Sequence, residues 1–218
     1  MEQVREKAQK AKNAALAVGA MHTDTKNAVL SAMAGALISQ QESILAANVA
    51  DLERAKAKGT PAALLDRLML DPARIQGMAD GLSELITLAD PVGEVTSMWV
   101  RPNGLRIGRQ RVPIGVVGII YEARPNVTAD AIGLCIKSGN AVVLRGGSEA
   151  IESNKAIVAA MASAAKAAGL PEGAIQLIDD TSREAATALM RLNGLIDVLI
   201  PRGGSGLIQS VVKNATVP

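Results

Sequence analysis

Aromatic residues are almost absent from this sequence: its 218 residues include one tryptophan, one tyrosine and no phenylalanine. A hydrophobic core must therefore be built from Ala, Val, Ile, Leu and Met. Rows of aromatic side chains on which nucleic-acid bases could stack are also missing. A single cysteine excludes an internal disulfide framework and fits a reducing compartment. A single histidine, His22, has no second His or Cys with which to form a metal site, so we assign it no role.

Long apolar runs and an excess of charge are lacking as well. No apolar run approaches the roughly 18 residues of a membrane span, and the charged N-terminus lacks the apolar core of a secretory signal. The 23 basic and 21 acidic residues leave a net charge of only +2. Bulk charge therefore gives no reason to expect a nucleic-acid or membrane partner, and we interpret the protein as cytoplasmic.

Residues 1–90 predict a helical segment without strands, because apolar residues recur there every three to four positions. Thr23 or Asp24 fits the N-cap of the second helix, and Asp71 and Pro72 fit the N-cap and first position of the last one. The expected helices cover about residues 4–18, 24–40 and 42–58, a short segment from Pro61, and 72–88.

Residues 91–112 predict a β-hairpin, because two strand-like runs are joined by Pro102-Asn103-Gly104. Four arginines lie on this ribbon: Arg101, Arg106, Arg109 and Arg111. They could form a face that binds anions or nucleic acid, but no aromatic residues lie between them. We favour a ribbon that is solvated or contacts another subunit.

From residue 113 onward, short apolar strands alternate with helices. Strands are expected near 114–121, 140–145, 174–179 and 195–200, with helices near 127–138, 149–168, 181–192 and 204–214. This alternation predicts an α/β fold with a Rossmann-like, doubly wound parallel sheet, whose ligands bind beyond the carboxyl ends of the strands. Residues 215–218 resemble the opening of a further strand, so we expect the sheet to be incomplete and the chain to be a fragment or truncated.

Two similar turns follow predicted strands. Arg145-Gly146-Gly147-Ser148 offers glycines, a fixed charge and the start of a helix to a phosphate or ribose, although a plain turn with Ser148 as helix cap is the alternative. Gly203-Gly204-Ser205 again follows a strand and opens a helix. Because both turns would face one crevice at the sheet edge, we favour an anionic cofactor there over two structural turns.

The segment from Tyr121 to Asn126 is a third candidate, at the end of the first sheet strand. Asn126 can cap the next helix, which is the commoner role, or donate its amide to an oxyanion. Arg124 is a candidate anchor for an acidic or phosphorylated substrate.

Three further residues fit structural roles. Cys135 lies within a helical apolar pattern without a nearby histidine, which favours a buried thiol over a nucleophile. Asp179 and Asp180 end the third strand, where they could bind ribose or cap the next helix, and the cap is favoured.

The runs VPIGVVGIIYEARPNVTADAIGLCIKSGNAVVLRGGSEA, LIPRGGSGLI and VVKNATVP resemble the gamma-glutamyl phosphate reductases, also called glutamate-5-semialdehyde dehydrogenases. These enzymes form a branch of the aldehyde dehydrogenase superfamily and act in proline biosynthesis. The resemblance implies NADPH-dependent reduction of L-glutamyl 5-phosphate to the semialdehyde with release of phosphate, through attack of a cysteine thiolate on the acyl phosphate.

Several residue roles follow from the resemblance alone. Arg145 would lie near the adenosine ribose and favour the 2′-phosphate of NADP, and the Gly203–Gly206 turn would lie under the pyrophosphate. An ungapped comparison with ordinary aldehyde dehydrogenases places Arg124 at the substrate oxyanion, whereas chemistry favours Asn126. The hairpin would help to build a homodimer, and the upstream glutamate kinase would be a functional partner.

The resemblance also implies that the nucleophilic cysteine lies in a Gly-Asn-Cys-His segment after Pro218. The catalytic domain would then be absent from this chain, and residues 113–218 would form a truncated NADP-binding domain that is inactive alone. Cys135 falls at a structural position of the family and cannot replace that thiol. Two alternatives stay open: a short, non-catalytic NADP-binding or regulatory paralogue, and a reductase of the superfamily with another substrate.

Overall fold

The computed structural model describes residues 2–122 and 124–218. Within them, the N-terminal part forms the expected helices, with one correction. His22 is the N-cap of the second helix, without a side-chain hydrogen bond, in place of Thr23 or Asp24. Asp71 caps the last helix as predicted, its Oδ1 accepting a hydrogen bond from Arg74 N at 2.7 Å. The helices are α1 (Glu2–Gly19), α2 (Thr23–Ser39), α3 (Gln41–Ala57), α4 (Ala62–Leu68) and α5 (Pro72–Thr87).

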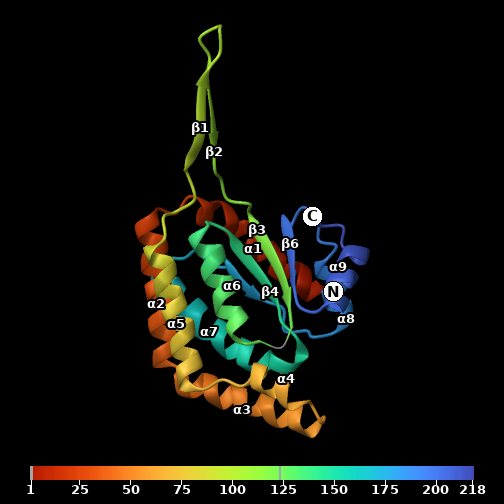
Figure 1. Ribbon diagram of the computed structural model, residues 1–218. Helices are drawn as coiled ribbons and strands as arrows, with labels where there is room; N and C mark the ends of the chain where they lie inside the picture. The colour runs from red at the N-terminus through yellow and green to blue at the C-terminus, as the bar shows by residue number, and fades with distance from the viewer. Residues whose placement is uncertain (1, 123) are drawn as a thin grey trace.

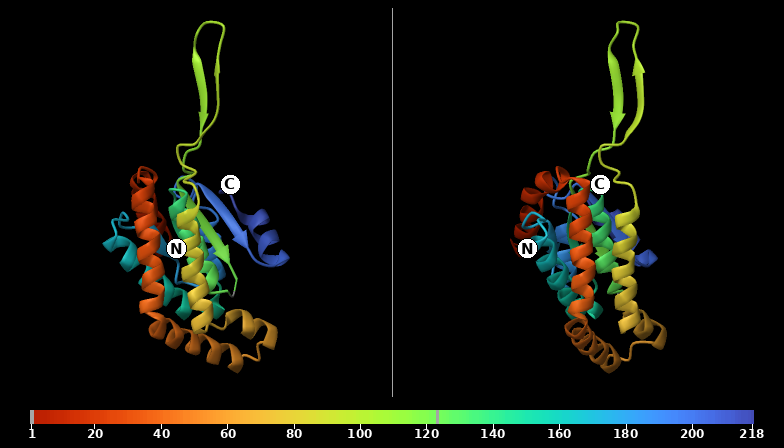
Figure 2. Two further views of the ribbon diagram at one scale, coloured as in Figure 1. Left: turned by 60° about the vertical axis from the view of Figure 1, so that its left-hand side comes forward. Right: turned by 90° about the vertical axis from the view of Figure 1, so that its left-hand side faces the viewer.

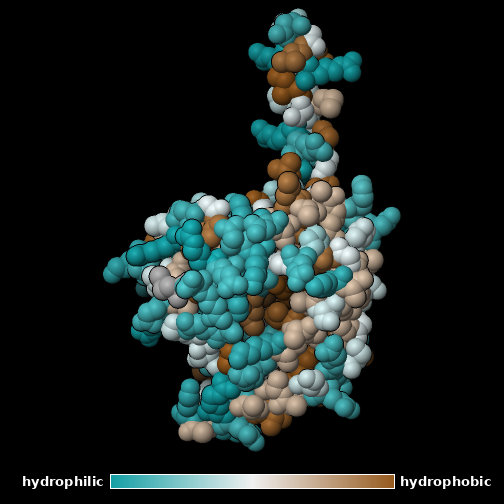
Figure 3. Space-filling view, turned by 180° about the vertical axis from the view of Figure 1, so that it is seen from behind, coloured by the Kyte–Doolittle hydropathy of each residue, from teal (hydrophilic) through white to brown (hydrophobic). Residues whose placement is uncertain are grey.

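The predicted hairpin is present and projects from the body of the protein (Figures 1 and 2). β1 (Val95–Val100) pairs with β2 (Arg106–Gln110) in antiparallel register. Apolar and polar side chains are both displayed on it (Figure 3), and Met98 and Val100 are 67% and 64% exposed. The hairpin therefore contributes almost nothing to the core of this chain.

The remaining strands form one parallel sheet. β3 (Val116–Tyr121), β4 (Ala141–Arg145), β5 (Ile175–Leu177) and β6 (Val198–Arg202) lie in the order β5-β4-β3-β6. The strand expected at 195–200 begins three residues later, because Leu195 and Ile196 both donate backbone hydrogen bonds to Leu192 O and so continue a turn. An apolar run alone does not distinguish a strand from a buried turn.

The described residues form four layers: α2 with α5, α6 with α7, the sheet, and α1 with α8 and α9 (Figures 1 and 2). Alternate side chains of β3 enter the two cores, Val117 and Ile119 on the α6 side and Val116 and Ile120 on the α1 side. The sheet is therefore buried on both faces, as a doubly wound fold requires. These helices are α6 (Asn126–Lys137), α7 (Ile151–Ala167), α8 (Arg183–Leu189) and α9 (Ser205–Asn214).

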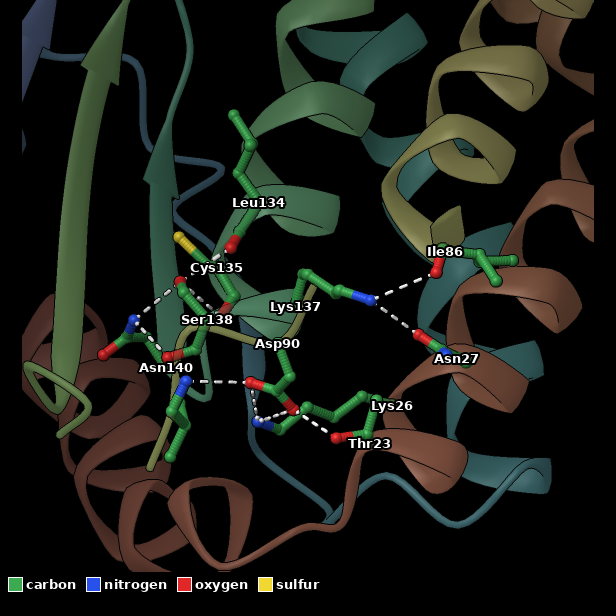
Figure 4. A network of polar contacts seen from close by, with 11 residues as sticks. Thr23, Lys26, Asn27, Ile86, Asp90, Leu134, Cys135, Lys137, Ser138 and Asn140 are labelled. Carbon is green, nitrogen blue, oxygen red and sulfur yellow. Dashed lines mark hydrogen bonds and ion pairs between the residues drawn. The ribbon is translucent and has the colours of Figure 1, made fainter. Parts of the chain in front are cut away.

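A buried ion pair lies at the base of the hairpin (Figure 4). The fully buried Lys26 of α2 donates to both carboxylate oxygens of Asp90, at 2.9 and 3.1 Å. Thr23 Oγ1 and Val92 N donate to the same carboxylate. Burial would raise the pKa of Asp90, but the hydrogen bonds from Lys26, Val92 and Thr23 lower it below its ordinary value. The segment that leads into β1 of the hairpin is thus fixed to α2.

The segment that leads from β2 of the hairpin to β3 is held by α6 and the turn after it. Asn140 Oδ1 accepts hydrogen bonds from Ile114 N at 2.7 Å and Gly115 N at 2.9 Å, just before β3. Lys137 Nζ, on α6, donates to Asn27 Oδ1 at 2.8 Å and Ile86 O at 3.3 Å (Figure 4). These bonds join α2, α5 and α6 around the same place.

The last residues lie beside the outer edge of β6. Leu199 N donates to Pro218 O at 2.7 Å, and Val217 is buried. Residues 215–218 thus follow the path of the expected further strand without completing it. In the part of the chain described here, no helix has both the length and the apolarity needed to cross a bilayer.

Candidate functional site

The sheet order creates a crevice between β3 and β6. From β3 the chain passes through α6 to β4 and through α7 to β5, and it then returns to place β6 on the other side of β3. Open α/β sheets bind ligands at the carboxyl ends of strands where the order reverses in this way. The candidate site is therefore the region where the loop after Tyr121 meets the turn after Arg202.

A pocket of about 380 Å³ occupies this crevice. Both connecting segments contribute to it, Glu122 and Arg124 after β3 and Gly203 and Gly204 after β6. Its lining is Leu64, Arg67, Glu122, Arg124, Val127, Arg202, Gly203 and Gly204. The pocket thus combines a glycine turn, a helix start and several cations, which suits an anionic ligand.

Glu122 shapes the glycine turn. Its Oε2 accepts a hydrogen bond from Gly204 N at 2.9 Å, and a Cβ on Gly203 would lie 2.6 Å from its carboxyl carbon. The backbone N–H groups of Ser205 and Gly206, which open α9, make no hydrogen bond within the described residues. They remain available to an anion that approaches the start of the helix.

The Arg145–Ser148 turn lies elsewhere. β4 and β6 flank β3 on opposite sides, so the end of β3 separates the two Arg-Gly-Gly-Ser turns, and the expectation that both face one crevice stays a prediction. Neither Gly146 nor Gly147 lines the crevice pocket. A sequence pattern shows that both turns lie at one edge of the sheet, but not how the strands are ordered along it.

Gly146 is required by packing. A Cβ there would lie 2.3 Å from Asn154 Nδ2 and 3.1 Å from the ring of Tyr121. Asn154 is fully buried and belongs to a chain of hydrogen bonds in which Tyr121 Oη, Thr128 Oγ1 and Asn154 Oδ1 are joined at 2.7 and 2.8 Å. Burial raises the pKa of Tyr121, so it stays a neutral donor or acceptor in this chain.

Two N–H groups at the start of the helix after this turn are occupied. Asp51 of α3, fully buried, accepts hydrogen bonds from Ser153 N at 2.8 Å and Glu152 N at 3.3 Å at the start of α7. Ser148 caps no helix, because Gly147 and Ala150 occupy the two cap positions. The Ser148-cap interpretation is therefore corrected, whereas the phosphate-binding interpretation of the turn stays a prediction.

Arg145 itself is held over the loop between β5 and α8. Its Nη2 donates to Thr181 O and to Ser182 O, the latter at 3.1 Å, while its Nε is buried without a partner in the described residues. Burial lowers the pKa of Arg145, and the nearby Glu149 and Asp180 oppose this shift. The guanidinium stays charged because its ordinary pKa is far above neutral.

Arg124 and Asn126 lie close together at the site. Both line a second cavity, of about 520 Å³, which adjoins the crevice pocket because Arg67 and Arg124 belong to both. Asn126 is the first residue of α6, with Pro125 as N-cap and no side-chain cap hydrogen bond. The capping role favoured for Asn126 is therefore not observed, and the residue lines the cavity instead.

The other candidates have structural roles. Ser182, rather than Asp179 or Asp180, caps α8, its Oγ accepting from Ala185 N at 3.1 Å. Asp179 accepts from Lys7 at 2.7 Å, and Asp180 accepts from Ser182 N at 2.9 Å. Cys135 is buried, as predicted, and burial raises the pKa of its thiol to about 12.

Sequence reasoning missed Arg67 and Asp130, which line these cavities, and it included Glu122 only as part of the Tyr121–Asn126 segment, without a role. The spacing of Asn126 and Asp130, four residues apart, could have placed both on one face of α6. No local pattern connects Arg67 of α4 to them. Among the described residues, no group of three or more His, Cys, Asp and Glu side chains is arranged to hold a metal ion.

The fold and the crevice at its strand ends are those of the cofactor-binding part of an aldehyde dehydrogenase. The sequence model of the aldehyde dehydrogenase family matches residues 1–216, and the chain belongs to this family. Enzymes of this family work with a nicotinamide cofactor.

Two relatives and one solved structure show which members of the aldehyde dehydrogenase family this chain is similar to. The chain is 63% identical to the gamma-glutamyl phosphate reductase of Heliobacterium modesticaldum, over 97% of this chain and 51% of that protein. It is 62% identical to that of Moorella thermoacetica, over 99% and 52%. The crystal structure of the Thermotoga maritima gamma-glutamyl phosphate reductase superposes with a TM-score of 0.97 at 46% identity, over 99% of this chain and 52% of that one. This chain thus spans about half the length of the relatives that it matches.

Proposed function

We propose that the protein carrying this chain reduces L-glutamyl 5-phosphate to L-glutamate 5-semialdehyde with NADPH and releases phosphate, as a step of proline biosynthesis in the cytoplasm. The observation that carries the proposal is the identity of 63% over 97% of the chain to a protein named for this reaction. In this proposal the chain supplies the cofactor-binding half. The nucleophilic thiol is supplied by the other half, because Cys135 is buried in the protonated form.

The crevice between β3 and β6 fits the diphosphate of a dinucleotide. The N–H groups of Ser205 and Gly206 and the positive end of α9 would hold it, and Gly203 and Gly204 allow it to approach the backbone. Glu122 takes the N–H of Gly204 and keeps the turn in its present shape. The cofactor supplies the hydride when it is bound.

Arg145 supports a preference for NADPH over NADH. Its guanidinium is held in place by Thr181 O and Ser182 O, and its Nη1 makes no hydrogen bond with the described residues. That group can pair with a 2′-phosphate but gains little from a 2′-hydroxyl. The change Arg145→Met should raise the KM for NADPH about 10- to 100-fold and leave the KM for NADH nearly unchanged. Equal effects on the two cofactors would contradict this assignment.

Arg124 and Asn126 are proposed to act on the reacting end of the substrate. Arg124 borders both the crevice pocket and the adjoining cavity, so it can reach a phosphoryl group that lies beside the cofactor. The amide of Asn126 lies at the start of α6 and can donate to a developing oxyanion.

The reaction is tested most directly in reverse. The full-length protein should convert L-glutamate 5-semialdehyde, phosphate and NADP+ to L-glutamyl 5-phosphate, NADPH and a proton, measured by absorbance at the NADPH band. Omission of phosphate should abolish turnover. Binding of NADPH without turnover would favour the non-catalytic paralogue, and faster turnover of a different aldehyde would favour another reductase of the superfamily.

The hairpin is proposed as a dimerisation element. Its exposed apolar side chains, among them Met98, Trp99 and Val100, are unusual for a surface ribbon and suit contact with a second subunit. Light scattering of the full-length protein should give a dimer mass, and a Met98→Glu/Val100→Glu variant should shift it toward the monomer. Glutamate kinase is the expected functional partner, because it would supply the reactive acyl phosphate.

A further inference from the structure

The cavity of about 520 Å³ beside the crevice has a mixed set of charges. It lies between α4, the start of α5 and the start of α6, and we refer to it as the α4–α6 cavity. Its lining is Asp66, Arg67, Met69, Leu70, Arg74, Gly77, Met78, Arg124, Asn126 and Asp130. Its volume lies within the range of small-molecule sites, and its carbon-rich wall comes from the methionines and Leu70.

Two of the charged side chains in this cavity, Asp66 and Arg74, already pair with each other. Arg74 Nη2 pairs with Asp66 Oδ1 at 2.7 Å, and Arg74 Nη1 donates to Asp66 O and Met69 O. These contacts fix α5 against the end of α4 and neutralise both side chains. They form a wall of the α4–α6 cavity, and the groups left to bind a ligand are Arg67, Arg124 and Asp130.

Asp130 is poorly compensated by the protein. It is half-buried on α6, and its carboxylate accepts no hydrogen bond within the described residues. The cation paired with it, Arg202, lies 3.9 Å away, beyond hydrogen-bond distance. Burial raises the pKa of Asp130, and Arg202 only partly opposes this shift. A carboxylate taken partly out of water without donors is unfavourable unless a ligand supplies a cation.

Arg67 and Arg124 carry the opposite charge to Asp130, and they too lack hydrogen-bond partners among the described residues. Both are exposed, and neither guanidinium makes a hydrogen bond within the described residues. They lie on the boundary between the α4–α6 cavity and the crevice pocket, because both hollows are lined by them. Arg124 belongs to the segment after β3, whereas Arg67 comes from α4.

We propose that the α4–α6 cavity binds the amino-acid head of the substrate, with Asp130 receiving the α-ammonium and Arg67 the α-carboxylate. This inference rests on the proposed function, in which a glutamyl chain extends from this head to the reacting carbonyl beside Arg124. A carboxylate next to guanidinium groups complements a zwitterion. It disfavours a dicarboxylate, which would face Asp130, and a simple aliphatic aldehyde, which would leave all three charges unpaired.

The test compares two aldehydes in the full-length enzyme, in the direction that reduces NADP+. L-Glutamate 5-semialdehyde carries the ammonium, and 5-oxopentanoate is the same chain without it. Asp130→Asn should raise the KM for the first about 10- to 100-fold, the worth of a hydrogen bond to a charged group, and leave the second unchanged or improved. Arg67→Met should raise the KM for both, because both carry the carboxylate.

Asp80→Asn is the matched control. Asp80 is an exposed carboxylate on α5 outside both cavities, with Gln76 Nε2 as its donor at 2.8 Å. This variant should keep both KM values. The kcat and the KM for NADP+ of this control should also stay within about twofold of wild type. Equal changes for both aldehydes after Asp130→Asn, or no change, would overturn the assignment.

A binding experiment separates this inference from the proposed reaction. L-Glutamate and glutarate are titrated into the full-length protein by calorimetry, which requires no turnover. Wild type should bind L-glutamate more tightly than glutarate, and Asp130→Asn should remove that preference. If turnover is absent but this preference is present, the proposed reaction fails and the amino-acid subsite stands. If turnover is present and the preference is absent in wild type, the subsite fails and the reaction stands.

Discussion

The two ends of the parallel sheet are built from similar residues but treat their charges in opposite ways. At the amino end, beneath the hairpin, the fully buried Lys26 pairs with Asp90, whose side chain is largely buried, and Lys137 donates to Asn27 and Ile86 O. At the carboxyl end, the guanidinium groups of Arg67 and Arg124 have no hydrogen-bond partner within the described residues, and the cation paired with Asp130 is 3.9 Å away.

The difference separates a structural role from a binding role. A buried charge that is fully paired holds elements together, and its loss leaves its partner without compensation. A charge that the protein leaves poorly paired in a cavity costs stability and is retained where a ligand completes it. The amino end therefore anchors the hairpin, and the carboxyl end is the proposed place for substrate and cofactor. Four predictions follow from the contrast, in decreasing order of expected effect.

The largest effect is expected from Lys26→Met at the amino end. This change leaves Asp90 buried without its cation and should lower the free energy of unfolding by about 3–5 kcal/mol. Urea unfolding would measure it. Lys10→Met is the control, because the Lys10 to Glu6 pair is more than half exposed and its loss should change the free energy of unfolding little. A loss below that of the control would show that the anchor is not needed.

A smaller effect is expected from Gly146→Ala at the carboxyl end. The new Cβ would overlap Asn154 Nδ2, so the change should cost about 1–3 kcal/mol by overpacking. Gly35→Ala, inside α2 with no atom within 4 Å of its added Cβ, should instead stabilise by about 0.5–1 kcal/mol. If Gly146→Ala also stabilised the protein, the packing explanation of this glycine would be wrong.

Asp90→Asn and Asp130→Asn should change the free energy of unfolding at pH 7 in opposite directions. The lowered pKa of Asp90 means that its ionised form stabilises the fold above about pH 4, a contribution that is lost as the pH falls through the folded pKa. Asp90→Asn should therefore destabilise at pH 7 and flatten the acid limb of the stability curve.

The raised pKa of Asp130 has the opposite effect on stability, because its ionised form lowers the free energy of unfolding once the pH exceeds the folded pKa. The free energy of unfolding of Asp130→Asn at pH 7 should equal or slightly exceed that of wild type, because solvent screens this partly exposed carboxylate, and the difference should disappear in acid. Urea unfolding of the two variants between pH 3 and 7 tests both signs. Destabilisation by Asp130→Asn at pH 7 would remove the contrast between the ends.

The smallest effect concerns Cys135. Because burial raises the pKa of this thiol to about 12, iodoacetamide at pH 8 should leave it unmodified in the folded protein. Peptide mapping should find modification only after unfolding. Modification of Cys135 at the rate of a free thiol would show that this region opens readily, and it would reopen the question of a reactive role.

Local patterns predicted the elements of the fold well. Glycine and proline positions, apolar periodicity and the Asp71 cap gave the helices, the hairpin and the alternating strands to within a few residues. Their order in the sheet and the partners of each helix start were not predicted. Asp51 reaches the start of α7 from about a hundred residues away, so neighbouring sequence could not reveal that those N–H groups are occupied.

The candidate site was only partly predictable for the same reason. Gly203, Arg124 and Asn126 follow strands and could be found by position, and they do lie beside one another in adjoining cavities. Arg67 belongs to a short helix that no motif connects to the sheet. Gly146 was assigned to phosphate approach, whereas its neighbour is a buried amide. Sequence alone shows that a glycine is needed but not which side of the backbone is crowded.

The position of α1 has a consequence for synthesis of the chain. Lys7 of α1 donates to Leu177 O and Asp179 Oδ1, about 170 residues later, and the helix covers the sheet face opposite α6. At typical translation rates the ribosome needs roughly 10 to 35 seconds to make the intervening segment. During this time the sheet-facing side of α1 has no partner. That side carries mostly alanine, with Ala8, Ala11 and Ala15 among its buried residues. Because this side of α1 exposes little apolar surface, the helix has only a weak tendency to self-associate before the sheet that it covers has formed.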